Sequence, residues 1–157
     1  MTSHPLRPAE VLGRVGGDED GAVLLFLGTV RDHADGRPVR GLRYEAYEAM
    51  AAEVLDEIAR EAADATGVRR LHVVHRTGEL DVGEVSVAIA VSSPHRDESY
   101  RASRLVIEEI KRRLPIWKRE FYTDGEAGWV EGTDPRTGGR TVDGSPAPSV
   151  AEGGEVR

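Results

Sequence analysis

The chain has 157 residues, the length of one domain, and 39% of them are hydrophobic. No apolar run approaches the roughly 18 residues that span a membrane, and residues 1–21 lack the apolar stretch of a secretory signal, so we expect a cytoplasmic protein with no membrane partner. The absence of cysteine excludes disulfides, thiolate metal sites and cysteine nucleophiles, and the net charge of −7 argues against nucleic-acid binding.

Hydrophobic periodicity and turn residues predict the elements of the first half of the chain. They are a polar lead-in over residues 1–20 with a short helix at 8–15, a buried strand at 21–30, a mobile loop at 33–38, a strand at 39–44 and a helix at 47–66. The last helix is the clearest, because apolar residues from Tyr47 and Met50 to Ala62 recur at three- and four-residue steps and form one stripe. Gly67 predicts its C-terminal end.

The second half of the chain predicts two further strands, a helix and two short extended segments. They are a strand at residues 68–77, a turn at 78–83, a strand at 84–92, a helix at 95–113, an extended segment at 116–122, a strand at 127–131 and a disordered tail at 132–157. Alternation in the second of these strands puts on one face Val85, Val87, Ile89 and Val91. The helix is expected to turn Tyr100 inward and to end near Leu114, because Pro115 disfavours helical geometry there.

The order of these elements is β-β-α-β-β-α-β-β. Adjacent strand pairs favour a largely antiparallel sheet, and helices separate the pairs. We therefore predict an α+β fold with two main helices, whose functional domain spans residues 21–131.

Several common signatures of catalytic and cofactor-binding sites are missing. There is no phosphate loop ending in Gly-Lys-Ser/Thr, no G-x-G-x-x-G after a strand and no G-x-S-x-G elbow. His72 and His75 are three residues apart on a predicted strand, which sends their side chains to opposite faces. We expect no metal site and no resident cofactor.

Basic residues are concentrated in one part of this acidic chain. Residues 96–119 carry a net charge of +4 and the rest carries −11, which indicates a binding site for a small anion. For the arginines in the middle of the helix we prefer the ordinary interpretation, a solvated face with ion pairs. The chain has 19 arginines and only two lysines, Lys111 and Lys118, on either side of the Pro115 bend. An ammonium group can exchange a proton where a guanidinium cannot, so this pair favours acid–base chemistry.

Two further groups fit an anion site. His95 and Arg96 begin the second long helix, where unpaired N–H groups and partial positive charge attract anions. Arg31 follows the buried strand and enters the mobile loop, a common place for ligand contacts.

Four motifs occur in a fixed order. They are F-x-G-x-V-R-x-H at residues 26–33, H-R-x-G-E-L at 75–80, S-x-H-R at 93–96 and K-x-x-x-P-x-W-K-R-E at 111–120, and the chain then closes with W-V-E at 129–131. This series resembles the family of the large, catalytic subunit of molybdopterin synthase, over about residues 18–131.

The resemblance implies a reaction and its partners. Such an enzyme installs two sulfurs in cyclic pyranopterin monophosphate, which becomes the dithiolene of molybdopterin. The sulfur arrives as a thiocarboxylate on the C-terminal glycine of a small ubiquitin-like subunit, whose tail enters a pocket of the large subunit. The family has an α/β-hammerhead fold, and the large subunit forms a homodimer with a small subunit at each end.

The resemblance also assigns roles to individual residues. Lys111 and Lys118 match the active-site lysines, with Lys111 nearest the thiocarboxylate and Lys118 on the pterin substrate. The positions that line the substrate pocket match Arg31, His95, Arg96 and, at its apolar edge, Phe26. Some relatives carry an arginine after W-V-E-A that reaches across the dimer, and here Gly132 and Thr133 follow instead.

Two other classes of function remain open at this point. The chain fits a non-catalytic module of the same fold, which binds an anion or a partner's tail without chemistry. A phosphate-ester hydrolase that uses Lys and His is less favoured, because metal ligands and clustered carboxylates are missing.

Overall fold

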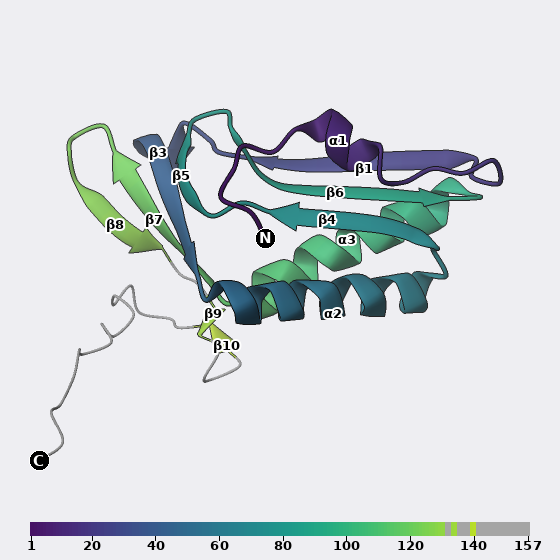
Figure 1. Cartoon of the computed structure of the whole chain (residues 1–157). Helices are drawn as coiled ribbons and strands as arrows, with labels where there is room; N and C mark the ends of the chain where they lie inside the picture. Colours follow the sequence, from purple (N-terminus) through teal and green to yellow (C-terminus); the bar gives the residue numbers. More distant parts are fainter. Residues whose placement is uncertain (131–132, 135–138, 141–157) are drawn as a thin grey trace, which may run out of the picture.

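The computed structural model describes residues 1–130, 133–134 and 139–140. Its elements, in chain order, are α1 (Pro8–Leu12), β1 (Ala22–Thr29), β2 (His33–Ala34), β3 (Arg37–Ala46), α2 (Glu48–Thr66), β4 (Arg70–His75), β5 (Gly78–Asp81), β6 (Val85–Ser93), α3 (Arg96–Arg113), β7 (Ile116–Tyr122), β8 (Ala127–Val130), β9 (Thr133–Asp134) and β10 (Gly139–Arg140) (Figure 1). The prediction of a disordered tail over 132–157 falls mostly outside the described residues, and β9 pairs with β10 within it.

The main strands form two antiparallel sheets. The first has the order β1-β6-β4, and the second has the order β2-β3-β7-β8 with β5 paired to the other side of β3. The predicted α+β class, with antiparallel strands and two main helices, is confirmed. The strands predicted as one sheet are divided between two, because β1 pairs with β6 instead of with its sequence neighbour β3.

The first sheet is covered on both faces. In Figure 1, α2 and α3 lie side by side below β4, β6 and β1, and α1 lies on the opposite side. Alternation along β6 explains this layering, because Val87, Ile89 and Val91 pack against the helices whereas Ala88 and Ala90 pack against Val11 of α1. None of the helices in the described part of the chain has the length and apolar character needed to cross a lipid bilayer.

Two short strands arise where the sequence predicts a loop and a turn. β2 lies in the predicted loop at 33–38, and β5 lies in the predicted turn at 78–83. β5 forms because β3 lies beside it: Leu42 pairs with Leu80, and the Leu80 side chain is buried. This long-range pairing overrides the local turn signal of Gly78 and Gly83, so the turn prediction was wrong there.

Three side chains that were expected to face inward lie at the surface. Tyr47 and Met50 at the start of α2 are 53% and 46% exposed, and Tyr100 of α3 is 60% exposed. The buried face of α3 instead contains Ser99, Ala102, Ser103, Val106 and Ile110. Small residues at these positions let the helix lie close to the sheet, which a pattern based on large apolar residues does not detect.

Candidate active site

A cavity of about 600 Å³ lies where the two sheets meet the C-terminal end of α3. Its lining comes from every element that the sequence motifs had singled out, except the start of α3. The lining includes Phe26, Gly28, Arg31, His33, Leu42, Tyr44, His75, Ser86, Val87, Ile107, Ile110, Lys111, Leu114, Lys118, Glu120 and Val130.

One wall of the cavity is a face of the second sheet. Tyr44 of β3 is directly opposite Lys118 of β7, which is in turn opposite Val130 of β8. Leu42 and Glu120 form the next row. Residues two apart on a strand share a face, so this register brings all five side chains to the cavity.

An ion pair dominates this wall. The Lys118 Nζ lies 2.8 Å from Glu120 Oε1, and the Tyr122 hydroxyl donates a hydrogen bond of 3.1 Å to Glu120 Oε2. The Glu120 side chain is only 5% exposed, whereas Lys118 is 27% exposed. A buried carboxylate must be paired to be tolerated, so Glu120 holds the Lys118 ammonium at the cavity surface.

The end of α3 supplies the second lysine. Ile107, Ile110, Lys111 and Leu114 follow the three- and four-residue steps of one helical face, and all four line the cavity. The helix ends at Arg113, and β7 begins at Ile116 after Pro115. This short connection, which the proline predicted, brings both lysines to the same cavity.

A β-bulge shapes the wall formed by the first sheet. Gly28 pairs with Val87 and Thr29 pairs with Val85, so Ser86 is the extra residue. Ser86 and Val87 therefore both line the cavity, and the Ser86 hydroxyl donates a hydrogen bond to the Gly28 carbonyl at 3.1 Å. Val85 consequently packs on the α1 side, so its predicted place with Val87 was wrong.

Glycine suits position 28 because the Val87 side chain occupies the space that a side chain would need there. A Cβ added to Gly28 would lie 2.6 Å from Val87 Cγ1. The glycine of the F-x-G-x-V-R-x-H motif therefore allows the bulge, while Phe26, half-buried, lines the cavity as the resemblance implied.

The loop after β1 brings a cation and an imidazole to the cavity. Arg31 and His33 both line it and are exposed. The His33 Nδ1 lies 2.6 Å from Asp32 Oδ1, and this hydrogen bond, followed by the charge of His33, lowers the pKa of the Asp32 carboxyl.

Two aromatic side chains complete the lining. The rings of Tyr44 and His75 meet edge to face, with centroids 5.1 Å apart. Burial raises the pKa of the Tyr44 phenol, whereas the Lys118 charge and the Ser86 hydroxyl act in the opposite direction. Burial also lowers the pKa of His75, to about 4.

His95 and Arg96 do not line this cavity. They begin α3, whereas Lys111 lies in its last turn; fifteen residues of helix separate Arg96 from Lys111 by about 22 Å. Both side chains are exposed. Four of the six predicted site residues therefore line one cavity within a single chain: Phe26, Arg31, Lys111 and Lys118. The other two, His95 and Arg96, lie outside it.

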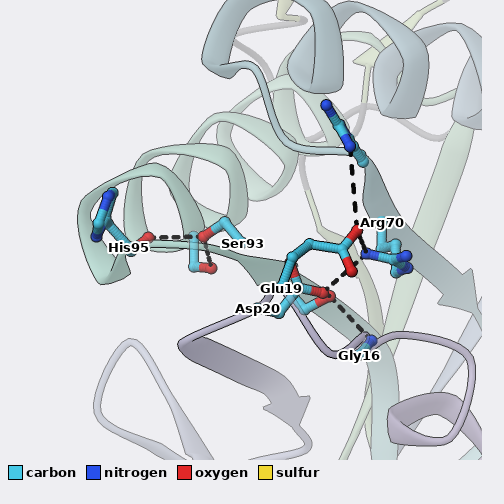
Figure 2. A network of polar contacts seen from close by, with 9 residues as sticks. Gly16, Glu19, Asp20, Arg70, Ser93 and His95 are labelled. Carbon is cyan, nitrogen blue, oxygen red and sulfur yellow. Dashed lines mark hydrogen bonds and ion pairs between the residues drawn. The ribbon is translucent and has the colours of Figure 1, made fainter.

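Hydrogen bonds hold the start of α3 in a defined conformation. The Ser93 hydroxyl lies 2.6 Å from both the His95 carbonyl and the Ser99 hydroxyl. Figure 2 shows this group beside a second network, in which Asp20 accepts hydrogen bonds from Ser92 at 2.6 Å and from Arg70 at 3.0 Å. The His95 ring points away from these contacts, so it is presented to the outside of the chain.

Four titratable residues of the cavity lining were not among the predicted site residues. Their type or position carried a signal in three cases: Glu120 is two residues from Lys118 on a strand, His33 is two residues from Arg31, and His75 begins the H-R-x-G-E-L motif. Tyr44 reaches the cavity through sheet pairing, which no local pattern reveals. Within the described ranges, no group of three or more His, Asp or Glu side chains is placed to hold a metal ion.

The fold and the cavity define a class of protein, an α+β domain in which two lysines and an arginine line one pocket. The MoaE protein family model matches residues 1–113, and this chain belongs to that family. The molybdopterin synthase catalytic subunit 1 of Mycobacterium tuberculosis is 45% identical over 130 residues, which are 83% of this chain and 88% of that one. The molybdopterin synthase catalytic subunit of Bacillus subtilis is 42% identical over 83% of this chain and 82% of its own length.

Solved structures agree with the sequence relatives. Molybdopterin synthase from Staphylococcus aureus has a TM-score of 0.77 and 36% identity, covering 82% of this chain and 93% of that chain. A complex of subunits 1 and 2 of the molybdopterin-converting factor from Helicobacter pylori has a TM-score of 0.59 and 26% identity, covering 71% and 73%. The family predicted from the four motifs is confirmed, and with it a sulfur-transfer enzyme of molybdenum-cofactor biosynthesis.

The buried His75 should make the free energy of unfolding depend on pH. Its pKa is lowered from 6.5 to about 4 in the folded chain, so between these values the unfolded chain binds the proton more tightly. The free energy of unfolding should therefore fall as the pH drops from 6.5 to 4, by about 3 kcal/mol from this residue. Urea unfolding across this range should show a smaller loss for His75→Asn than for the unmodified protein. Equal losses in both would contradict the buried, neutral imidazole.

Proposed function

We propose that this chain transfers sulfur from the C-terminal thiocarboxylate of a small ubiquitin-like carrier subunit to cyclic pyranopterin monophosphate, and so forms the dithiolene of molybdopterin. The observation that carries this proposal is the cavity in which Lys111, Lys118 and Arg31 come together. All three side chains are hydrogen-bond donors that carry positive charge. They suit the two anionic groups of the reaction, a cyclic phosphate and a thiocarboxylate.

Each cation has a distinct role in this proposal. Lys111, at the exposed end of α3, polarises the thiocarboxylate carbonyl or moves a proton. Lys118, held by Glu120, contacts the pterin substrate and assists the same step. Arg31 binds the phosphate, and Phe26 forms the apolar edge of the pocket.

The sulfur donor is a partner protein, because the chain has no cysteine to carry sulfur. The related Helicobacter pylori protein was solved as a complex of two subunits. We propose the same kind of assembly here, in which the glycine tail of the carrier enters the cavity. A cytoplasmic location stays a prediction.

His95 and Arg96 take part through a homodimer in this proposal. Helix α3 keeps them about 22 Å from Lys111 of the same chain, so they can reach a phosphate in the cavity only from a second subunit. In a two-fold dimer each subunit would then complete the other's site. The ordered start of α3, fixed by Ser93, suits this role.

Replacing Lys111 tests its proposed role in proton transfer. Lys111→Ala and Lys111→Arg should each lower the single-turnover rate of dithiolene formation by about 100-fold or more, because neither alanine nor a guanidinium can exchange the proton. Product can be measured as its oxidised fluorescent derivative. Arg112→Ala, which changes the neighbouring exposed cation, is the matched control and should keep the rate within about two-fold.

The arginine variant separates the enzyme from a non-catalytic binding module. In a module that needs only positive charge, Lys111→Arg would bind the cyclic phosphate and the carrier tail as tightly as the unmodified protein does. The unmodified protein of such a module would form no dithiolene. Full activity of Lys111→Arg would contradict the proton-transfer role.

A mixed-dimer experiment tests the shared site. Lys111→Ala and Arg96→Ala subunits are produced together, so that about half of the dimers contain one of each. If Arg96 acts across the dimer, one site in each mixed dimer is intact, and activity should recover to about a quarter of the unmodified level. Recovery no greater than the average of the two separate variants would show that Arg96 does not act across the dimer.

A further inference from the structure

His75 is a buried polar residue in the cavity wall for which the proposed sulfur transfer has no role. It ends β4, is 4% exposed and lines the cavity. The edge-to-face contact with Tyr44 fixes the plane of its ring. A fixed imidazole facing a ligand pocket presents one defined hydrogen-bonding group to whatever binds there.

The hydrogen bonds of His75 determine which group that is. The Nδ1 atom lies 3.0 Å from the Arg76 carbonyl oxygen, which can only accept, so Nδ1 carries the proton. Burial keeps the ring neutral, since the pKa of His75 is about 4. Nε2 is therefore an unprotonated acceptor, and no residue in the described part of the chain donates a hydrogen bond to it.

This acceptor differs from the other polar groups around it. Arg31, Lys111 and Lys118 can only donate, and they carry charge. The Glu120 carboxylate already binds the Lys118 ammonium and the Tyr122 hydroxyl. The Ser86 hydroxyl donates its proton to the Gly28 carbonyl, and its oxygen can still accept, as the Tyr44 hydroxyl can. His75 Nε2 is distinguished from these hydroxyls because it is held on a fixed ring and has no proton of its own, so an uncharged N–H group of a ligand can pair with it.

We propose that His75 determines substrate specificity by accepting, at Nε2, a hydrogen bond from an uncharged N–H group of a substrate in the cavity. This inference rests on the proposed function, which supplies two sources of such a group: the pterin ring system and the last peptide groups of the carrier tail. A ligand without the N–H group would leave Nε2 buried and unpaired, which disfavours its binding.

Two substitutions separate this role from a structural one. His75→Asn keeps an N–H donor near the Nδ1 position for the Arg76 carbonyl but has no atom at Nε2. His75→Gln places an oxygen acceptor near the Nε2 position and loses the Nδ1 donor. A purely structural role depends on the Arg76 contact and predicts that the glutamine variant suffers at least as much as the asparagine variant.

Titration calorimetry with two probes provides the test. One probe is cyclic pyranopterin monophosphate, and the other is the carrier subunit with an ordinary C-terminal glycine carboxylate. His75→Asn should raise the Kd of one probe about ten-fold. The Kd of His75→Gln for the same probe should stay within about three-fold of the value for the unmodified protein. The probe whose Kd changes identifies the source of the N–H group. Unchanged affinity of His75→Asn for both probes, or equal losses in both variants, would overturn the inference.

A measurement on the unmodified protein keeps the inference testable if a variant does not fold. The ¹⁵N spectrum of labelled histidine should show Nε2 of His75 unprotonated at pH 7, and its resonance should shift when the accepting bond forms on addition of one probe. An unmoved resonance at saturation with both probes would overturn the inference alone. Failure of the unmodified protein to bind either probe or to form dithiolene would instead overturn the proposed function.

Discussion

The arrangement of the cavity depends on the ion pair between Lys118 and Glu120. Glu120 is a buried carboxylate whose two oxygens bind the Lys118 ammonium at 2.8 Å and the Tyr122 hydroxyl at 3.1 Å. Burying that charge without its partner would cost several kcal/mol, so the lysine side chain is held where the carboxylate needs it. The same constraint keeps the Lys118 ammonium, with its charge and its exchangeable protons, at the cavity surface. Most of the other lining residues are apolar or neutral. This contact therefore fixes the position of the ammonium that the proposed sulfur transfer uses.

The rest of the site is built by elements that bring other groups to that ammonium. The connection through Pro115 places Lys111 of α3 and Lys118 of β7 around one cavity. The bulge between β1 and β6, made possible by Gly28, turns Ser86 and Val87 toward the same space. The loop after β1 adds Arg31 as a further cation. The cavity lining thus combines three cations with the neutral imidazole of His75, which suits a substrate with both an anionic group and uncharged polar edges.

The sequence alone predicted the elements with strong local signals. The periodicity of 47–66 and the Gly67 stop predicted α2, and Pro115 predicted the bend that brings the two lysines to one site. The strand β5 and the cavity position of Tyr44 were not predictable, because they depend on pairing between segments far apart in the chain. Its place after a strand and the motif order singled out Arg31, and the helix predicted at 95–113 already placed His95 and Arg96 at the opposite end from Lys111, so their separation within one chain followed from the sequence. Local propensity specifies elements, whereas a site forms where elements meet.

The most direct test of this account is the sulfur-transfer rate of Glu120→Gln at saturating concentrations of both substrates. Glutamine keeps the shape of the side chain and still accepts a hydrogen bond, but it removes the charge that holds Lys118. The account predicts a rate at least about ten-fold lower with a thermal midpoint within a few degrees of the unmodified protein. Glu126→Gln, at an exposed carboxylate paired with Arg37 outside the cavity, should keep the full rate. A Glu120→Gln variant with the rate of the unmodified protein would contradict the central role of the ion pair.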